Sequence, residues 1–80
     1  MNNLETYNKV FVDTLGINED QLAGLEYLAV AGWDSLGHMS LIANLEDAFD
    51  IMMETDDIID LSSFEKGMEI LHTKYEVEFM

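Results

Sequence analysis

Apolar residues recur at helical spacing along most of the chain. The first stripe consists of Leu4, Tyr7, Phe11 and Leu15. Gly16 follows this stripe where a helix C-cap is expected, so a first helix is predicted to end there. A second helix is predicted from about Ser35 to Asp50, after a long connection whose apolar residues are expected to anchor it on the core. These anchors are Ile17, Leu22, Leu25, Leu28, Val30 and Trp33.

Two further helices are predicted in the second half of the chain. A short one runs from Thr55 to Leu61, with Thr55 as its cap and two aspartates in its first turn. The sequence Ser62-Ser63-Phe64-Glu65 fits a capping box at the start of a fourth helix, whereas residues 76–80 are expected to fray. The chain is therefore predicted to be all-α, a small four-helix bundle of three longer helices and one short helix. It is expected to form a single domain over residues 1–80, with its core at about residues 4–75.

The predicted second helix is apolar on two sides. One side gathers the residues that would face the core, namely His38, Leu41, Ile42, Leu45, Ala48 and Phe49. The opposite side would carry, from the start of the helix onward, the apolar Leu36, Met39 and Ala43 and then the acidic Glu46, Asp47 and Asp50. An apolar anchor beside charged residues is typical of a docking surface. Two other interpretations remain open: the short helix covers Leu36 and Met39, or they are ordinary exposed apolar residues.

Ser35 lies at the start of this second helix. The unpaired backbone N–H groups there and the positive end of the helix dipole favour an anion, and a phosphate suits the place well. Ser35 could therefore be the N-cap of the helix, a phosphate acceptor, or both.

The chain is strongly acidic, with 17 Asp and Glu residues against three lysines, no arginine and a net charge of −14. Nucleic acids and anionic membranes are therefore poor partners, and basic protein surfaces are favoured ones. The charge also favours a monomer. The N-terminus has no secretion signal and no apolar run could span a bilayer, so a cytoplasmic protein is expected. Since the chain has no cysteine, it has no thiol of its own.

The run Gly32-Trp33-Asp34-Ser35-Leu36-Gly37-His38-Met39, with the helix pattern that continues to Phe49, resembles an acyl carrier protein. The resemblance covers about residues 4–75, and the length, the acidity and the short third helix agree with it. Members of this family are small acidic helical bundles, either free-standing or domains of polyketide and peptide synthetases. A carrier of the free-standing type is expected here.

The resemblance implies a role for several residues. Ser35 would carry 4′-phosphopantetheine, transferred from coenzyme A by a phosphopantetheinyl transferase, and Asp34 would be the acid beside this cofactor-binding serine. The thiol of the arm would hold an acyl or aminoacyl group as a thioester, so the thiol that the chain lacks would be imported. The recognition face for the transferase and later partners would consist of Leu36, Met39, Ala43, Glu46 and Asp47. The later partners would be a ligase that loads acyl or aminoacyl groups and downstream acyltransferase or synthase enzymes.

The family also suggests where a cargo would lie and which pathway it would serve. An apolar interior lined by such residues as Leu41, Leu45 and Phe49 could shelter the cargo, with the short third helix as a gate. Gly37 and Ser40 stand at positions where carriers of fatty acid synthesis usually or often have acids, and no proline precedes the short helix. These departures favour a carrier in a specialised biosynthetic pathway.

Other functions are less favoured by the sequence. His38 and Asp34 are a possible metal pair, but two ligands do not make a site, and no metal is expected. Catalysis by Ser35 is not expected, because His38, the nearest base, would lie on the core side. The main alternative is an unmodified acidic helical adaptor or inhibitor that binds basic protein surfaces through the second helix. It would need Ser35 only as a helix cap, so Ser35→Ala would cost about 1 kcal/mol and leave binding intact.

Overall fold

The computed structural model describes residues 2–79, and its regular elements are helical. They are α1 (Asn3–Leu15), a single 3₁₀ turn η1 (Glu19–Gln21), α2 (Ser35–Phe49), α3 (Thr55–Asp60) and α4 (Phe64–Tyr75). The expected all-α bundle of three longer helices and one short helix is confirmed. Within residues 2–79, no helix has the length and apolar character that crossing a membrane requires.

Local polar contacts define both ends of the three longer helices. Each begins after a side chain that accepts a hydrogen bond from the first helical turn, and these caps are Asn2, Asp34 and Ser63. Each ends at a residue with left-handed backbone, and these residues are Gly16, Asp50 and Glu76. The predicted end of the first helix at Gly16, where φ is 68°, is confirmed.

Two of the predicted caps are wrong. The fourth helix begins after Ser63, which places Lys66 rather than Glu65 at the third helical position, so the capping box does not form. Glu65 Oε2 instead accepts a hydrogen bond from the Gly24 N–H at 3.0 Å and ties the long connection to α4. In the short helix Thr55 is already the first helical residue, and Glu54 holds the cap position without a side-chain cap bond.

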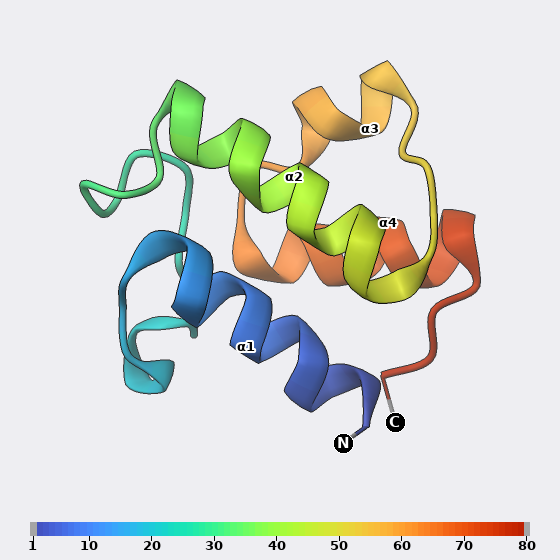
Figure 1. Ribbon diagram of the computed structural model, residues 1–80, viewed down its shortest axis with the longest axis horizontal. Helices are drawn as coiled ribbons and strands as arrows, with labels where there is room; N and C mark the ends of the chain where they lie inside the picture. Colours follow the sequence, from blue (N-terminus) through green and yellow to red (C-terminus); the bar gives the residue numbers. More distant parts are fainter. Residues whose placement is uncertain (1, 80) are drawn as a thin grey trace.

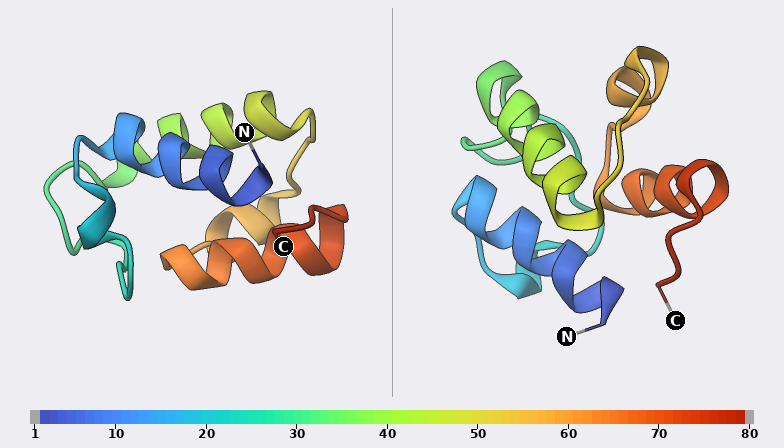
Figure 2. Two further views of the ribbon diagram at one scale, coloured as in Figure 1. Left: turned by 90° about the horizontal axis from the view of Figure 1, so that it is seen from below. Right: turned by 45° about the vertical axis from the view of Figure 1, so that its right-hand side comes forward.

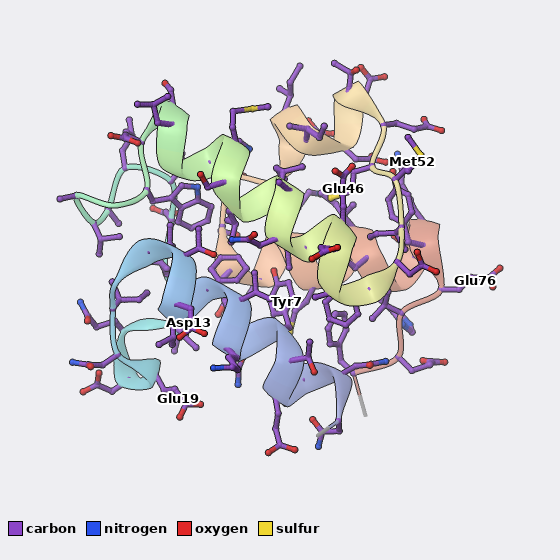
Figure 3. The ribbon with its side chains drawn as sticks, in the orientation of Figure 1. Tyr7, Asp13, Glu19, Glu46, Met52 and Glu76 are labelled. Carbon is purple, nitrogen blue, oxygen red and sulfur yellow. The ribbon has the colours of Figure 1, made fainter. Side chains whose placement is uncertain are left out.

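The helices form two layers around an aromatic core. α1 and α2 lie antiparallel and side by side (Figure 1), and the turned views place α3 and α4 on the other side (Figure 2). The ring centroids of Tyr7 and Phe11 are 4.8 Å apart, and both lie 5.1 Å from that of Phe64. Figure 3 shows Tyr7 pointing into the middle of the molecule, where its hydroxyl donates to the Phe64 carbonyl oxygen at 2.8 Å. Burial raises the pKa of this hydroxyl far above its usual value.

The core side of α2 agrees with the sequence pattern except at one residue. Leu41, Ile42 and Leu45 are buried, and His38 and Phe49 are half-buried. Ala48 is exposed, contrary to the prediction, because it borders a surface hollow between α1 and α2.

The long connection is held against the segment that leads into α4. The Tyr27 N–H donates to the Ser62 carbonyl at 2.9 Å, and the Phe64 N–H donates to the Leu25 carbonyl at 2.8 Å. Of the expected anchors, Leu22, Leu25 and Trp33 are buried, and Trp33 is fully enclosed. Leu28 is not an anchor: its backbone is left-handed with φ of 71°, and its side chain is 66% exposed. Its N–H closes a turn by donating to the Trp33 carbonyl at 3.0 Å, which leaves the side chain in solvent.

The expected fraying after α4 is also wrong for the residues that the structure describes. Val77 is buried, and its N–H donates to the Leu71 carbonyl at 3.1 Å. The ring centroid of Phe79 lies 5.2 Å from that of Tyr7 and 6.2 Å from that of Phe49. The alternation of apolar and acidic residues in this tail therefore reflects packing against the open edge of the core.

The short helix α3 is fixed to α4 through Asp57, a charged side chain that is only 2% exposed. Asp57 Oδ1 accepts from Lys74 Nζ and Oδ2 accepts from the Tyr75 hydroxyl, each at 2.7 Å. The Tyr75 hydroxyl in turn accepts from the Glu54 N–H at 2.8 Å. The hydrogen bonds from Lys74 and Tyr75 hold the pKa of Asp57 below its ordinary value.

We expect Asp57→Asn to lower the free energy of unfolding by about 2 kcal/mol at neutral pH, because it breaks a buried, charge-assisted network. A lowered pKa means that the ionised carboxylate stabilises the fold above about pH 4 and that this contribution is lost as the pH falls through the lowered value. Urea unfolding should therefore show a difference between wild type and variant that shrinks below about pH 4.

The matched control is Asp56→Asn, the same change at an exposed neighbour, which should cost less than about 0.5 kcal/mol. A difference for Asp57→Asn that is the same at all pH values would contradict the assignment.

Candidate functional site

The first turn of α2 is capped by Asp34. Its Oδ1 accepts from the Gly37 N–H at 2.8 Å, and its carbonyl accepts from the His38 N–H at 2.7 Å. Ser35 is therefore the first residue inside the helix, and the interpretation of Ser35 as the N-cap is wrong. The serine hydroxyl is exposed and is not used to cap the backbone.

Two glycines allow the connection to pass close to this turn. A Cβ atom at Gly37 would collide with the carbonyl oxygen of Gly32, and a Cβ atom at Gly32 would collide with the carbonyl oxygen of Leu15. The glycine after the serine-leucine pair is thus required by the close approach of two backbones. It holds Ser35 at the corner where the connection enters the helix.

A relay of hydrogen bonds starts at the buried Trp33 and crosses α2. The indole N–H donates to His38 Nδ1 at 3.0 Å, so the ring proton of the neutral histidine lies on Nε2. That N–H donates to the Ile58 carbonyl at 2.8 Å, near the end of α3. The expectation that His38 is a half-buried residue bonding to a nearby group is confirmed.

An open cleft of about 340 Å³ lies between α2 and α3 beside Ser35. Its lining is mainly apolar and includes Met39, Ile58, Ile59 and Leu61, with Tyr27 and His38 next to the serine. Leu41 and Leu45, expected to line a space for cargo, are fully buried and do not border it. The hollow next to Ser35 is therefore between the helices at the surface and not inside the bundle.

Tyr27 is a site residue that sequence reasoning missed. Its hydroxyl oxygen is 3.3 Å from Ser35 Oγ, although it lies on the long connection. Ile59 was also missed; it lies on α3 at the cleft and is 71% exposed. An aromatic residue eight positions before a serine gives no signal at helical spacing, because the backbone between them is irregular.

Four of the five residues of the predicted recognition face are exposed, and the fifth, Glu46, is bonded within the fold. Leu36 is 80% exposed and Met39 is 58% exposed, so the interpretation that the short helix covers them is wrong. Ala43 and Asp47 are also exposed. Glu46 is half-buried, and its Oε2 accepts from the Met53 N–H at 2.8 Å, on the side of α2 that faces the connection to α3 (Figure 3).

None of the three lysines lines the cleft beside Ser35. Each of the three lysines forms an ion pair elsewhere, and the acidic partners are Asp13, Glu69 and Asp57. The backbone N–H groups at the helix N-terminus and the Tyr27 hydroxyl are placed to meet an anion at Ser35.

The surroundings of Ser35 suit a hydroxyl that another enzyme modifies. Both ring nitrogens of His38 are engaged in hydrogen bonds, and the Asp34 carboxylate is engaged at Gly37. Ser35 Oγ contacts the Tyr27 hydroxyl, and neither His38 nor Asp34 is bonded to it, so the geometry of a serine–base pair is not formed. A phosphodiester fits the site, since the hydroxyl is exposed at the first helical residue with backbone N–H donors beside it.

The chain matches the model of a known family. The model of the PP-binding family, described as the phosphopantetheine attachment site, matches residues 9–66, and the chain belongs to this family. The family consists of non-catalytic carriers of the acyl carrier type that hold covalently attached 4′-phosphopantetheine, so the resemblance seen in the sequence is confirmed. A search of curated proteins gave no significant match.

The cap assignment predicts unequal losses of stability for two neighbouring substitutions. Asp34→Ala should lower the free energy of unfolding by about 1 kcal/mol, because the Gly37 N–H loses its acceptor. Ser35→Ala should change it by less than about 0.5 kcal/mol, because no cap is lost. Urea unfolding of both variants checks this, and an equal cost for the two would show that Ser35 shares the capping role.

Proposed function

We propose that this protein carries acyl or aminoacyl groups as thioesters on a 4′-phosphopantetheine arm attached to Ser35. The observation that supports the proposal is the exposed Ser35 hydroxyl, which is free of the capping role and lies within the segment that matches the family. The unmodified adaptor would give Ser35 no role beyond a helix cap, and Asp34 holds that position, so the match to the phosphopantetheine attachment family favours the carrier.

Attachment would be a group transfer carried out on this chain by a phosphopantetheinyl transferase. Ser35 Oγ would form a bond to the phosphorus of coenzyme A that bears pantetheine, 3′,5′-ADP would leave, and the transferase would take up the serine proton. When bound, the arm supplies the thiol that the cysteine-free chain lacks. The chain itself contributes the fixed corner at Asp34 and the N–H groups of the first helical turn.

The exposed outer side of α2 supports a docking role in the proposal. Leu36 and Met39 would insert into the partner, with Ala43 between them and the acids further along the helix. Asp47 and the rest of the −14 charge would attract basic surfaces of the transferase, a loading ligase and downstream acyltransferase or synthase enzymes. Glu46 would contribute by shaping the α2–α3 connection, since its carboxylate is bound to the Met53 N–H.

The pathway is proposed to be a specialised one. Gly37 is required by the close backbone contact with Gly32, so the position cannot accept the acid that carriers of fatty acid synthesis often have there. Ser40 adds no charge to the exposed side of α2. A partner that recognises acidic side chains at these two positions would therefore bind this chain poorly.

Attachment is tested by the intact mass of the chain before and after incubation with coenzyme A, magnesium and a broad-specificity transferase. Wild type should gain one phosphopantetheine, and Ser35→Ala should gain none while remaining folded. Ser40→Ala is the matched control, because it removes an exposed serine hydroxyl from the same helix and should load fully. Loading of Ser35→Ala would place the arm on another residue.

The docking face is tested by the rate of loading. Leu36→Ala should lower the kcat/KM of the transferase roughly tenfold, which corresponds to about 1.4 kcal/mol of lost contact. It should leave stability within about 0.5 kcal/mol of wild type, since the side chain is exposed. Leu28→Ala is the control, an exposed leucine outside α2. Equal rates for both variants would exclude Leu36 from the interface.

A further inference from the structure

The Tyr27 side chain is held beside Ser35 by the fold. Its hydroxyl lies 3.3 Å from Ser35 Oγ, and either oxygen can be the donor. The backbone N–H of Tyr27 is fixed on the Ser62 carbonyl at 2.9 Å. Its ring stands nearly perpendicular to the rings of Trp33 and His38, at centroid distances of 6.2 and 5.6 Å. The place of the hydroxyl is therefore set by these contacts and does not depend on Ser35 alone.

Esterification of Ser35 would change the chemistry of this contact. A serine hydroxyl donates and accepts, whereas an esterified oxygen has no proton to donate. Tyr27 would then be the donor of the pair and would face a phosphodiester whose free oxygens share a negative charge. A hydrogen bond to a charged oxygen is shorter and stronger than one between two neutral hydroxyls.

The distribution of charged side chains indicates that a neutral group donates the hydrogen bond to the phosphodiester. All three lysines are paired elsewhere, and the chain has no arginine. The nearby Asp34 carboxylate is itself negative and is turned to the Gly37 N–H. Among the side chains that line the cleft, the Tyr27 hydroxyl is the donor within hydrogen-bond distance of Ser35 Oγ.

We propose that Tyr27 positions the phosphopantetheine arm by donating a hydrogen bond from its hydroxyl to the phosphodiester at Ser35. The inference rests on the proposed attachment at Ser35. Tyr27 lines the cleft together with Met39 and Ile59, so a phosphate bound to it starts the arm on the cleft side of the serine. Tyr27 thus sets the direction in which the arm leaves the helix.

Wild-type protein allows a direct test, because the chain has three tyrosines in different surroundings. Tyrosine labelled with ¹³C at the carbon that bears the hydroxyl reports on hydrogen bonding at that group. On loading with phosphopantetheine, the Tyr27 signal is expected to shift. The signals of Tyr7 and Tyr75 should stay in place, since their hydroxyls are bonded to Phe64 and Asp57 within the fold. An unshifted Tyr27 signal in fully loaded protein overturns the proposal.

Tyr27→Phe gives the complementary measurement, because it removes the hydroxyl and retains the ring that packs on Trp33. In the loaded variant, the ³¹P resonance is expected to shift toward that of a small phosphodiester and to sharpen as the arm gains mobility. Ser62→Ala is the matched control, because it removes another exposed hydroxyl from the cleft lining, and its ³¹P resonance should equal that of wild type. Identical ³¹P resonances in wild type and Tyr27→Phe contradict the proposal.

Intact mass separates this inference from the attachment on which it rests. Loaded wild-type protein with unchanged signals overturns the role of Tyr27 and leaves Ser35 attachment standing. Failure of wild type to gain the arm overturns both together. If Tyr27→Phe folds but the transferase does not load it, the ¹³C comparison of unloaded and loaded wild type decides whether Tyr27 bonds to the arm.

Discussion

The indole N–H of Trp33 is a polar group on a fully buried side chain, and the arrangement of the site depends on how it is satisfied. His38 Nδ1 accepts its hydrogen bond, and this fixes the tautomer of the imidazole. The remaining ring N–H must then donate, and it finds the Ile58 carbonyl at the end of α3, where helical partners are missing. One histidine therefore connects the core, the helix that bears Ser35 and the short helix opposite.

The short helix α3 illustrates why such polar contacts matter. Six residues are too few for a helix that is stable by itself, so tertiary contacts must hold it. His38 binds it to α2, and the buried Asp57 binds it to α4 through Lys74 and Tyr75. The cleft beside Ser35 remains open between these two attachments, with the exposed Ile59 at its edge. The hydrogen bonds of His38 and Asp57 thus hold in place the short helix that borders this surface.

Much of the fold and the family could be predicted from the sequence, because helices and motifs are local. Periodicity located the helices, and the run around Ser35 indicated the family before any contact was known. The wrong predictions concern side chains whose partners lie far along the chain, and helix caps that were placed one residue from their true position. Glu65 bonds to Gly24 instead of closing a capping box, and Val77 packs on the core where fraying was expected. Tyr27 reaches Ser35 only because the connection folds back on itself, which no spacing rule encodes.

The central claim is that Ser35 carries the arm in the cell, and it is tested most directly on protein isolated from its natural source. Proteolytic peptides of that protein should be sequenced by tandem mass spectrometry. The account predicts a phosphopantetheine group on the peptide that contains Ser35, with fragment ions that place it on that residue. A peptide found only in the unmodified form, in cells whose other carriers are modified, would contradict the account.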